Sequence, residues 1–128
     1  FTNISGKTGI YVQYALVRAK KLLKNSSIDT RKINLDISDF DESDINLIRG
    51  LIKFEYYFKL SLENNEPHHL ADYLYELSNL FNSMYQNENI LENKSETVKL
   101  NKLKISEYFI SYSTLLMECL GLEPAEKM

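Results

Sequence analysis

The sequence has few residues that break helices and few that favour strands. Its 128 residues include only four glycines and two prolines, and valine and threonine are scarce beside leucine, lysine, glutamate and asparagine. No internal repeat is visible. This composition favours long helices and argues against a fold built on a sheet.

Other absences exclude further classes of protein. No stretch approaches the roughly 20 apolar residues needed to cross a bilayer, and no basic segment followed by an apolar run opens the chain. We therefore expect no membrane association and a cytoplasmic location. The lone cysteine, Cys119, cannot form an internal disulfide, and its apolar neighbours predict a buried structural thiol.

The sequence also has fewer basic than acidic residues, 15 against 18. The net charge is −3, whereas a general nucleic-acid binder would usually be basic, so any RNA contact must depend on a local patch. The chain contains 44% hydrophobic and 26% charged residues, which is ordinary for a globular protein. We expect one soluble, monomeric domain over residues 1–128.

Helical periodicity marks four segments. The first runs over residues 8–25. The second begins at Asp41, which can cap it with Asp44 in the first turn, and ends at residues 64–65. The third begins at Pro67. The fourth begins with a capping-box spacing, Asn93 and Glu96, and ends at Gly121.

Each segment has an apolar stripe at helical spacing. The stripes are Val12, Leu16, Ala19 and Leu23; Leu47, Leu51, Phe54, Phe58 and Leu62; Leu70, Leu74, Leu77, Phe81 and Met84; and Ile105, Phe109, Tyr112, Leu116 and Leu120. Residues 26–40 lack this period and predict a linker with at most a short turn. The expected fold is all-α, an antiparallel bundle of about four long helices.

A second face of the first segment is not explained by the core. At 100° per residue, Tyr11, Tyr14 and Arg18 fall together, away from the stripe that contains Val12 and Leu16. These residues are therefore candidates for binding.

Catalytic and cofactor motifs are weak. Gly6-Lys7-Thr8 resembles the end of a phosphate-binding loop, but Phe1 stands where that motif requires a glycine. His68 and His69 are adjacent on a helix and point in different directions, which argues against a shared metal. We expect no catalytic residue, cofactor site or metal site in this chain.

Three segments resemble the C-terminal, DALR-type anticodon-binding domain of arginyl-tRNA synthetases. The segment SGKTGIYVQYALVRAK is similar to the family pattern TGPYLQYAHAR, and EPHHLADYLYELSNLFNSMY is similar to its proline-started helix with a terminal FN-x-x-Y. The chain end, LLMECLGLEPAEKM, resembles the family's terminal LLGI-x-APERM. The matches occur in order and span almost the entire chain.

Some positions depart from the family pattern. Ile10 replaces the usual proline, Leu16 the usual histidine and Lys127 the usual arginine. No tyrosine of the pattern is lost. The family's upstream HIGH-like and KMSKS-like signatures are absent, so this chain should not activate arginine.

The resemblance implies an RNA-binding role. In the family, residues matching Tyr11, Tyr14, Tyr85 and Met128 lie around the anticodon loop, whose middle base, a cytosine, is a principal identity element. The implied partners are arginine tRNA and the catalytic core of the parent enzyme, which uses ATP and Mg. We further infer that Arg18 and the lysines of the same helix contact phosphates.

A different class of function stays open. A helical bundle of the same descent could have lost tRNA binding and instead join a protein partner. A free-standing hydrolase or metal enzyme is a distant third interpretation, because no converging polar site is visible.

Overall fold

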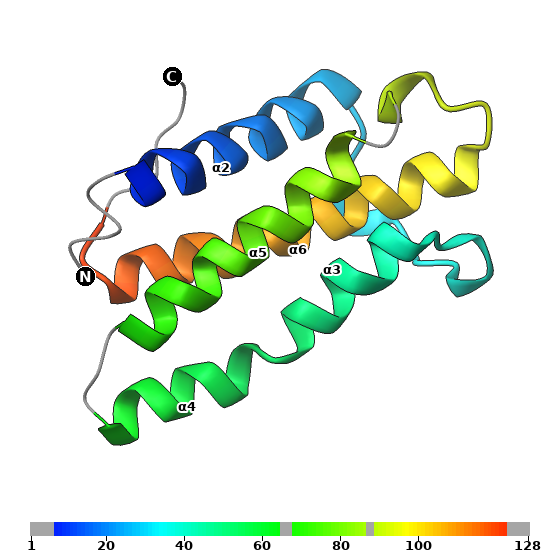
Figure 1. Ribbon diagram of the computed structural model, residues 1–128. Helices are drawn as coiled ribbons and strands as arrows, with labels where there is room; N and C mark the ends of the chain where they lie inside the picture. Colours follow the sequence, from blue (N-terminus) through cyan, green and yellow to red (C-terminus); the bar gives the residue numbers. More distant parts are fainter. Residues whose placement is uncertain (1–6, 65–67, 87–88, 123–128) are drawn as a thin grey trace.

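The chain folds into an antiparallel bundle of helices (Figure 1). The computed structural model describes residues 7–64, 68–86 and 89–122. Its α-helices are α2 (Lys7–Ser26), α3 (Glu42–Ile52), α4 (Phe54–Asn64), α5 (His68–Gln86) and α6 (Glu96–Cys119). No strand occurs in these ranges. The all-α antiparallel bundle expected from the sequence is confirmed.

Helices α5 and α6 lie at the centre of the bundle, with α2 along one side and α3 followed by α4 along the other (Figure 1). The main core gathers most of the predicted stripe residues of α2, α3, α5 and α6. The prediction is wrong for Leu62, the last residue of the second stripe, which is 67% exposed. A smaller cluster of Leu22, Ile33, Ile90 and Leu103 closes the end of the bundle where α6 begins. Between them, these clusters hold α2 firmly against α5 and α6.

None of the helices in the described ranges is both long enough and apolar enough to cross a membrane.

The predicted second helix is divided at Lys53, so the single helix expected over residues 41–64 is wrong in this detail. The Tyr73 hydroxyl donates to the Gly50 carbonyl at 2.5 Å, and the Lys53 N–H donates to the same oxygen at 3.2 Å. In a continuous helix this carbonyl would accept from Phe54. A side chain that enters the backbone ladder in this way bends a helix.

Several helix ends in the described ranges follow local signals, whereas the predicted start of the third helix at Pro67 lies outside the described residues. Asp41 and Asp44 form the capping box that opens α3, and Gly121 adopts a φ of 75° after α6. The N-cap of α6 is Ser95, whose hydroxyl accepts from the Val98 N–H, and not Asn93 as the spacing predicted. Asn93, two residues before the N-cap, instead accepts a hydrogen bond from the Ser95 N–H.

The prediction for Cys119 is wrong, because its side chain is exposed. It lies in the last turn of α6, where Leu116, Met117 and Leu120 occupy the positions that face the core. The apolar residues next to Cys119 in the sequence therefore lie on a neighbouring face of the helix, and Cys119 itself does not face the core.

The segment between α2 and α3 contains two 3-10 turns, η1 (Thr30–Lys32) and η2 (Ile37–Asp39), where the sequence indicated at most one. The Asn101 amide of α6 accepts from the Asp36 N–H at 2.8 Å and donates to the Asp36 carbonyl at 2.9 Å. This pair of bonds fastens the linker to α6.

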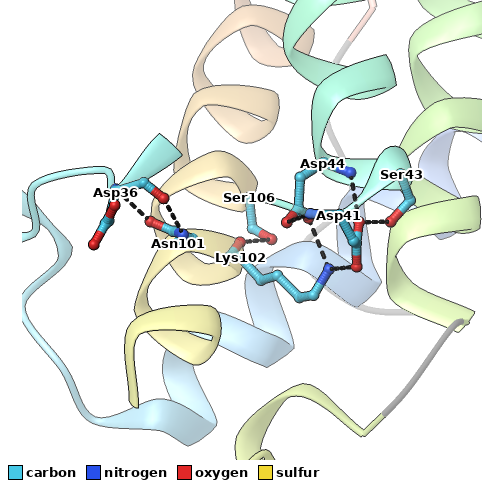
Figure 2. A network of polar contacts seen from close by, with 7 residues as sticks. All are labelled: Asp36, Asp41, Ser43, Asp44, Asn101, Lys102 and Ser106. Atoms are coloured by element: carbon cyan, nitrogen blue, oxygen red, sulfur yellow. Dashed lines mark hydrogen bonds and ion pairs between the residues drawn. The ribbon is translucent and has the colours of Figure 1, made fainter. Parts of the chain in front are cut away.

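A buried ion cluster next to it joins α6 to the start of α3 (Figure 2). The Lys102 ammonium lies 2.8 Å from the Asp41 carboxylate and 2.7 Å from that of Asp44. The side chains of Lys102 and Asp44 are completely buried, whereas that of Asp41 is partly exposed. The two aspartates that form the capping box of α3 are thus also the counter-ions of Lys102 on α6.

Candidate nucleic-acid interface

Helix α2 concentrates positive charge in an acidic protein. Its charged residues are Lys7, Arg18, Lys20, Lys21 and Lys24, and no aspartate or glutamate lies among them. Lys21 and Lys24 are exposed. Because no carboxylate of the same helix neutralises these charges, α2 can attract an anion despite the net charge of the chain.

A stripe of polar and aromatic residues follows one side of α2. Tyr11, Tyr14, Arg18, Lys21 and Asn25 recur at alternating spacings of three and four, which place them one above another on a helix. The opposite side contributes Val12, Leu16 and Ala19 to the core. The face inferred from helical geometry is therefore present, and it runs beside α5.

The centre of this stripe is an arginine between two aromatic rings. The Arg18 guanidinium carbon lies 4.5 Å from the centre of the Tyr14 ring and 4.9 Å from that of Tyr85, which comes from α5. Its Nη1 also donates to Asn82 Oδ1 at 3.0 Å. Tyr14 is nevertheless 47% exposed, so part of its ring faces solvent.

The two helices that build the site run in the same direction and in a constant register (Figure 1). Tyr11 packs on Tyr75, with ring centres 5.3 Å apart, and Arg18 bonds Asn82 two turns further along. Each pair joins residues 64 positions apart in the sequence. The seam between α2 and α5 is therefore lined by aromatic rings, with Arg18 between two of them.

A hollow of about 350 Å³ continues the seam beyond Tyr85. It is lined by Lys21, Leu22, Asn25, Tyr85, Asn89, Ile90 and Leu91. Its volume lies near the lower end of the roughly 300 to 1,000 Å³ typical of pockets for small organic groups. A cation, two amides and an aromatic ring could together receive a planar polar group such as a nucleobase.

A second hollow is less suited to RNA. It measures about 180 Å³, lies between α3 and α6, and is lined by Leu35, Ile48, Leu51, Ile52, Tyr108 and Tyr112. None of these side chains carries a positive charge. Among the residues that the structure describes, no cluster of histidine, cysteine and acidic side chains could hold a metal.

The structure brings together three of the five residues selected from the sequence, namely Tyr14, Arg18 and Tyr85. Tyr11 lies on the same seam but pairs with Tyr75. Met128 lies outside the described residues.

Sequence reasoning missed Asn82 and Tyr75 as members of the site. Asn82 belongs to the FN-x-x-Y motif and stands three positions before Tyr85, a spacing that places both on one side of α5. That spacing was a usable signal for Asn82. The position of Tyr75 depends on how α2 packs on α5, which no local pattern reports.

Comparison with known proteins identifies the family. The model of the DALR anticodon binding domain matches residues 12–128. The chain is 36% identical to an arginine–tRNA ligase of Buchnera aphidicola subsp. Schizaphis graminum, covering 98% of this chain and 22% of the relative. It is 30% identical to an arginine–tRNA ligase of Serratia proteamaculans, covering 96% and 21%.

A solved structure agrees with the sequence comparisons. The arginyl-tRNA synthetase of Thermus thermophilus superimposes with a TM-score of 0.84 at 27% identity, over 94% of this chain and 21% of that chain. The chain thus spans about a fifth of the length of the relatives it matches. From its sequence and its helical architecture, this chain belongs to the family of DALR anticodon binding domains.

Proposed function

We propose that this chain binds the anticodon loop of an arginine tRNA, as part of a longer arginine–tRNA ligase. The remaining chain of that ligase would carry the aminoacylation site with its ATP and Mg. The proposal rests chiefly on one observation: Arg18, on a helix without acidic residues, contacts the rings of Tyr14 on the same helix and of Tyr85 on α5. Family membership and the ligases among the relatives support it.

The chemistry of the seam fits a single-stranded RNA loop. Unstacked bases of a loop can rest on aromatic rings or on guanidinium planes, and their edges can bond polar side chains. Each such stack contributes roughly 1 to 3 kcal/mol to binding. The exposed part of the Tyr14 ring offers one such platform, and the hollow beside Tyr85 offers a place for a second base.

In this arrangement, we expect lysines of α2 to make the phosphate contacts. Arg18 already contacts two rings and Asn82, so its contribution is to hold the stack and to present its remaining N–H groups. Lys21 and Lys24 are exposed one and two turns further along α2, where they can meet the backbone of the loop. Met128 is proposed as a loop contact on the resemblance alone.

A titration with three RNAs tests the proposal. The chain should bind an arginine tRNA transcript more tightly than the same transcript with its middle anticodon cytosine replaced by uridine, and more tightly than a non-cognate tRNA. Equal affinity for all three would contradict anticodon recognition. Absence of binding would instead favour a protein-interaction module. We also propose that the parent enzyme is cytoplasmic and that this domain is monomeric.

A further inference from the structure

Asn82 is a buried polar residue at the centre of the seam. Its side chain is only 6% exposed, and its Oδ1 accepts the 3.0 Å hydrogen bond from Arg18 Nη1. A buried polar residue on a helix face that otherwise packs against the core is costly unless it is hydrogen-bonded. Its partner here is the guanidinium that lies between two tyrosine rings.

The two ring contacts cannot by themselves define where the guanidinium lies. Cation–π attraction depends mainly on distance from the ring face, so a guanidinium can slide and turn over it at small cost. The arginine side chain also loses rotamer entropy when it is held in one position. A hydrogen bond to a fixed acceptor restricts both movements, because it prefers a short distance and a nearly straight angle.

We propose that Asn82 is a positioning residue for RNA binding, which holds Arg18 between Tyr14 and Tyr85 before the RNA arrives. The inference rests on the proposed function, since it assigns the seam to the anticodon loop. Preorganisation of this kind reduces the ordering cost of binding. Asn82 acts through Arg18 and needs no contact with the RNA.

Proton NMR of the free chain tests the positioning without any RNA. An arginine held between two rings has side-chain resonances shifted upfield by ring currents, and Asn82→Leu should return those of Arg18 towards ordinary values. Asn82→Asp keeps the acceptor and should retain the shift. Asn46→Leu, at an exposed position of α3 away from the seam, is the matched control and should change nothing.

The RNA arm is a double-mutant cycle on the same chain. Asn82→Leu should weaken binding of arginine tRNA about tenfold, the effect of a hydrogen bond to a charged group. In an Arg18→Met background the same substitution should change binding less than about twofold, because Asn82 then has nothing to position.

Three results would overturn the proposal. The first is an unshifted Arg18 spectrum in the unsubstituted chain, which needs no variant to fold. The second is an Arg18 spectrum that Asn82→Leu leaves unchanged. The third is an equal loss of tRNA affinity in both backgrounds, which would make Asn82 merely structural. If the proposed function fails, the unsubstituted chain does not bind tRNA, and the spectra still decide whether Asn82 positions Arg18.

Discussion

The Tyr14 ring contacts Arg18 and is also partly exposed to solvent. Arg18 covers one side of its ring at 4.5 Å, while 47% of the residue stays exposed. A buried ring would contribute mainly to folding, with roughly 3 to 5 kcal/mol lost on truncation. A residue with this exposure leaves part of its ring available for a ligand, so a substitution should affect RNA binding more than stability.

Tyr14→Ala should cost roughly 1 to 3 kcal/mol of tRNA affinity, because a stacking platform is removed. It should cost only about 0.5 to 1 kcal/mol of unfolding free energy, the value of an exposed cation–π contact. Tyr14→Phe keeps the ring and should lose less affinity.

Urea denaturation and tRNA titration on the same protein measure both quantities. Tyr56→Ala, an exposed tyrosine on α4, is the control, and a mutant that is stable and binds like the parent removes Tyr14 from the site.

Asp41 should contribute to the dependence of stability on acid. Burial raises the pKa of its carboxyl, but hydrogen bonds from Lys102, Ser43 and the Asp44 N–H outweigh burial and lower the pKa to about 2. A carboxyl with a depressed pKa stabilises the fold above its unfolded pKa of about 4, and this contribution is lost as the pH falls towards 2.

Asp41→Asn keeps a side chain that can cap α3 but removes the titration. Its unfolding free energy should therefore change less between about pH 4 and pH 2 than that of the parent. Urea midpoints across this range measure the difference. Asp39→Asn, at an exposed neighbouring residue, should behave like the parent. Parallel curves for Asp41→Asn and the parent would show that Asp41 is not responsible.

At the scale of elements, the cluster around Lys102 decides how α6 meets α3. Burial lowers the pKa of Lys102, but the bonds to Asp41 and Asp44 outweigh it and raise the pKa, so the ammonium is charged at neutral pH. Burial raises the pKa of Asp44 even though Lys102 opposes this change. Each buried charge therefore depends on its partner.

Lys102→Met should cost roughly 3 to 5 kcal/mol of unfolding free energy, because it leaves the Asp44 carboxylate buried without its cation. Adding Asp44→Asn should restore part of the loss. Lys99→Met, one turn earlier, breaks only a partly exposed pair with Glu96 at 3.3 Å and should cost less than about 1 kcal/mol. Equal losses for the two lysines in denaturant titrations would contradict the buried-pair argument.

The Tyr73 hydroxyl bonds the backbone at the division between α3 and α4. Tyr73→Phe removes the bond to the Gly50 carbonyl and keeps the ring stacked on Tyr57, whose centre is 4.7 Å away. The expected loss is roughly 1 kcal/mol of unfolding free energy, since Lys53 still donates to that carbonyl. Urea denaturation measures it, with Tyr108→Phe, an exposed tyrosine, as the control. A mutant as stable as the parent would show that this hydrogen bond does not stabilise the fold.

For the whole molecule, the distribution of charge matters more than its total. The net charge is −3, yet α2 contains no acidic residue. RNA affinity should therefore fall steeply with salt, because lysines that meet phosphates release counterions from the RNA.

Replacing Lys21 and Lys24 together by glutamine should make the slope of log affinity against log salt concentration less negative by about 1 to 1.5, or roughly 0.7 per phosphate contact. Replacing the exposed Lys53 and Lys59, at the division of α3 and α4 and within α4, should leave the slope unchanged. Titrations of tRNA at several salt concentrations measure it. The same slope in both double mutants would place the RNA elsewhere.

The sequence by itself determined what depends on neighbours within a turn or two of helix. The core stripes of α5 and α6, the Asp41 cap, the Gly121 stop and the shared face of Tyr11, Tyr14 and Arg18 all follow from helical periodicity and backbone bonding. These features were predictable because their cause is local.

Only the tertiary structure decided what depends on how one helix packs on another. The register of α2 against α5 brings Tyr85 and Asn82 to Arg18 and turns Tyr11 to Tyr75. The Tyr73 hydroxyl bonds the Gly50 carbonyl where α3 is divided from α4, although no proline marks the place. Each of these contacts joins residues far apart in the chain, so side-chain volumes across the whole bundle determine it, and no local pattern encodes that information.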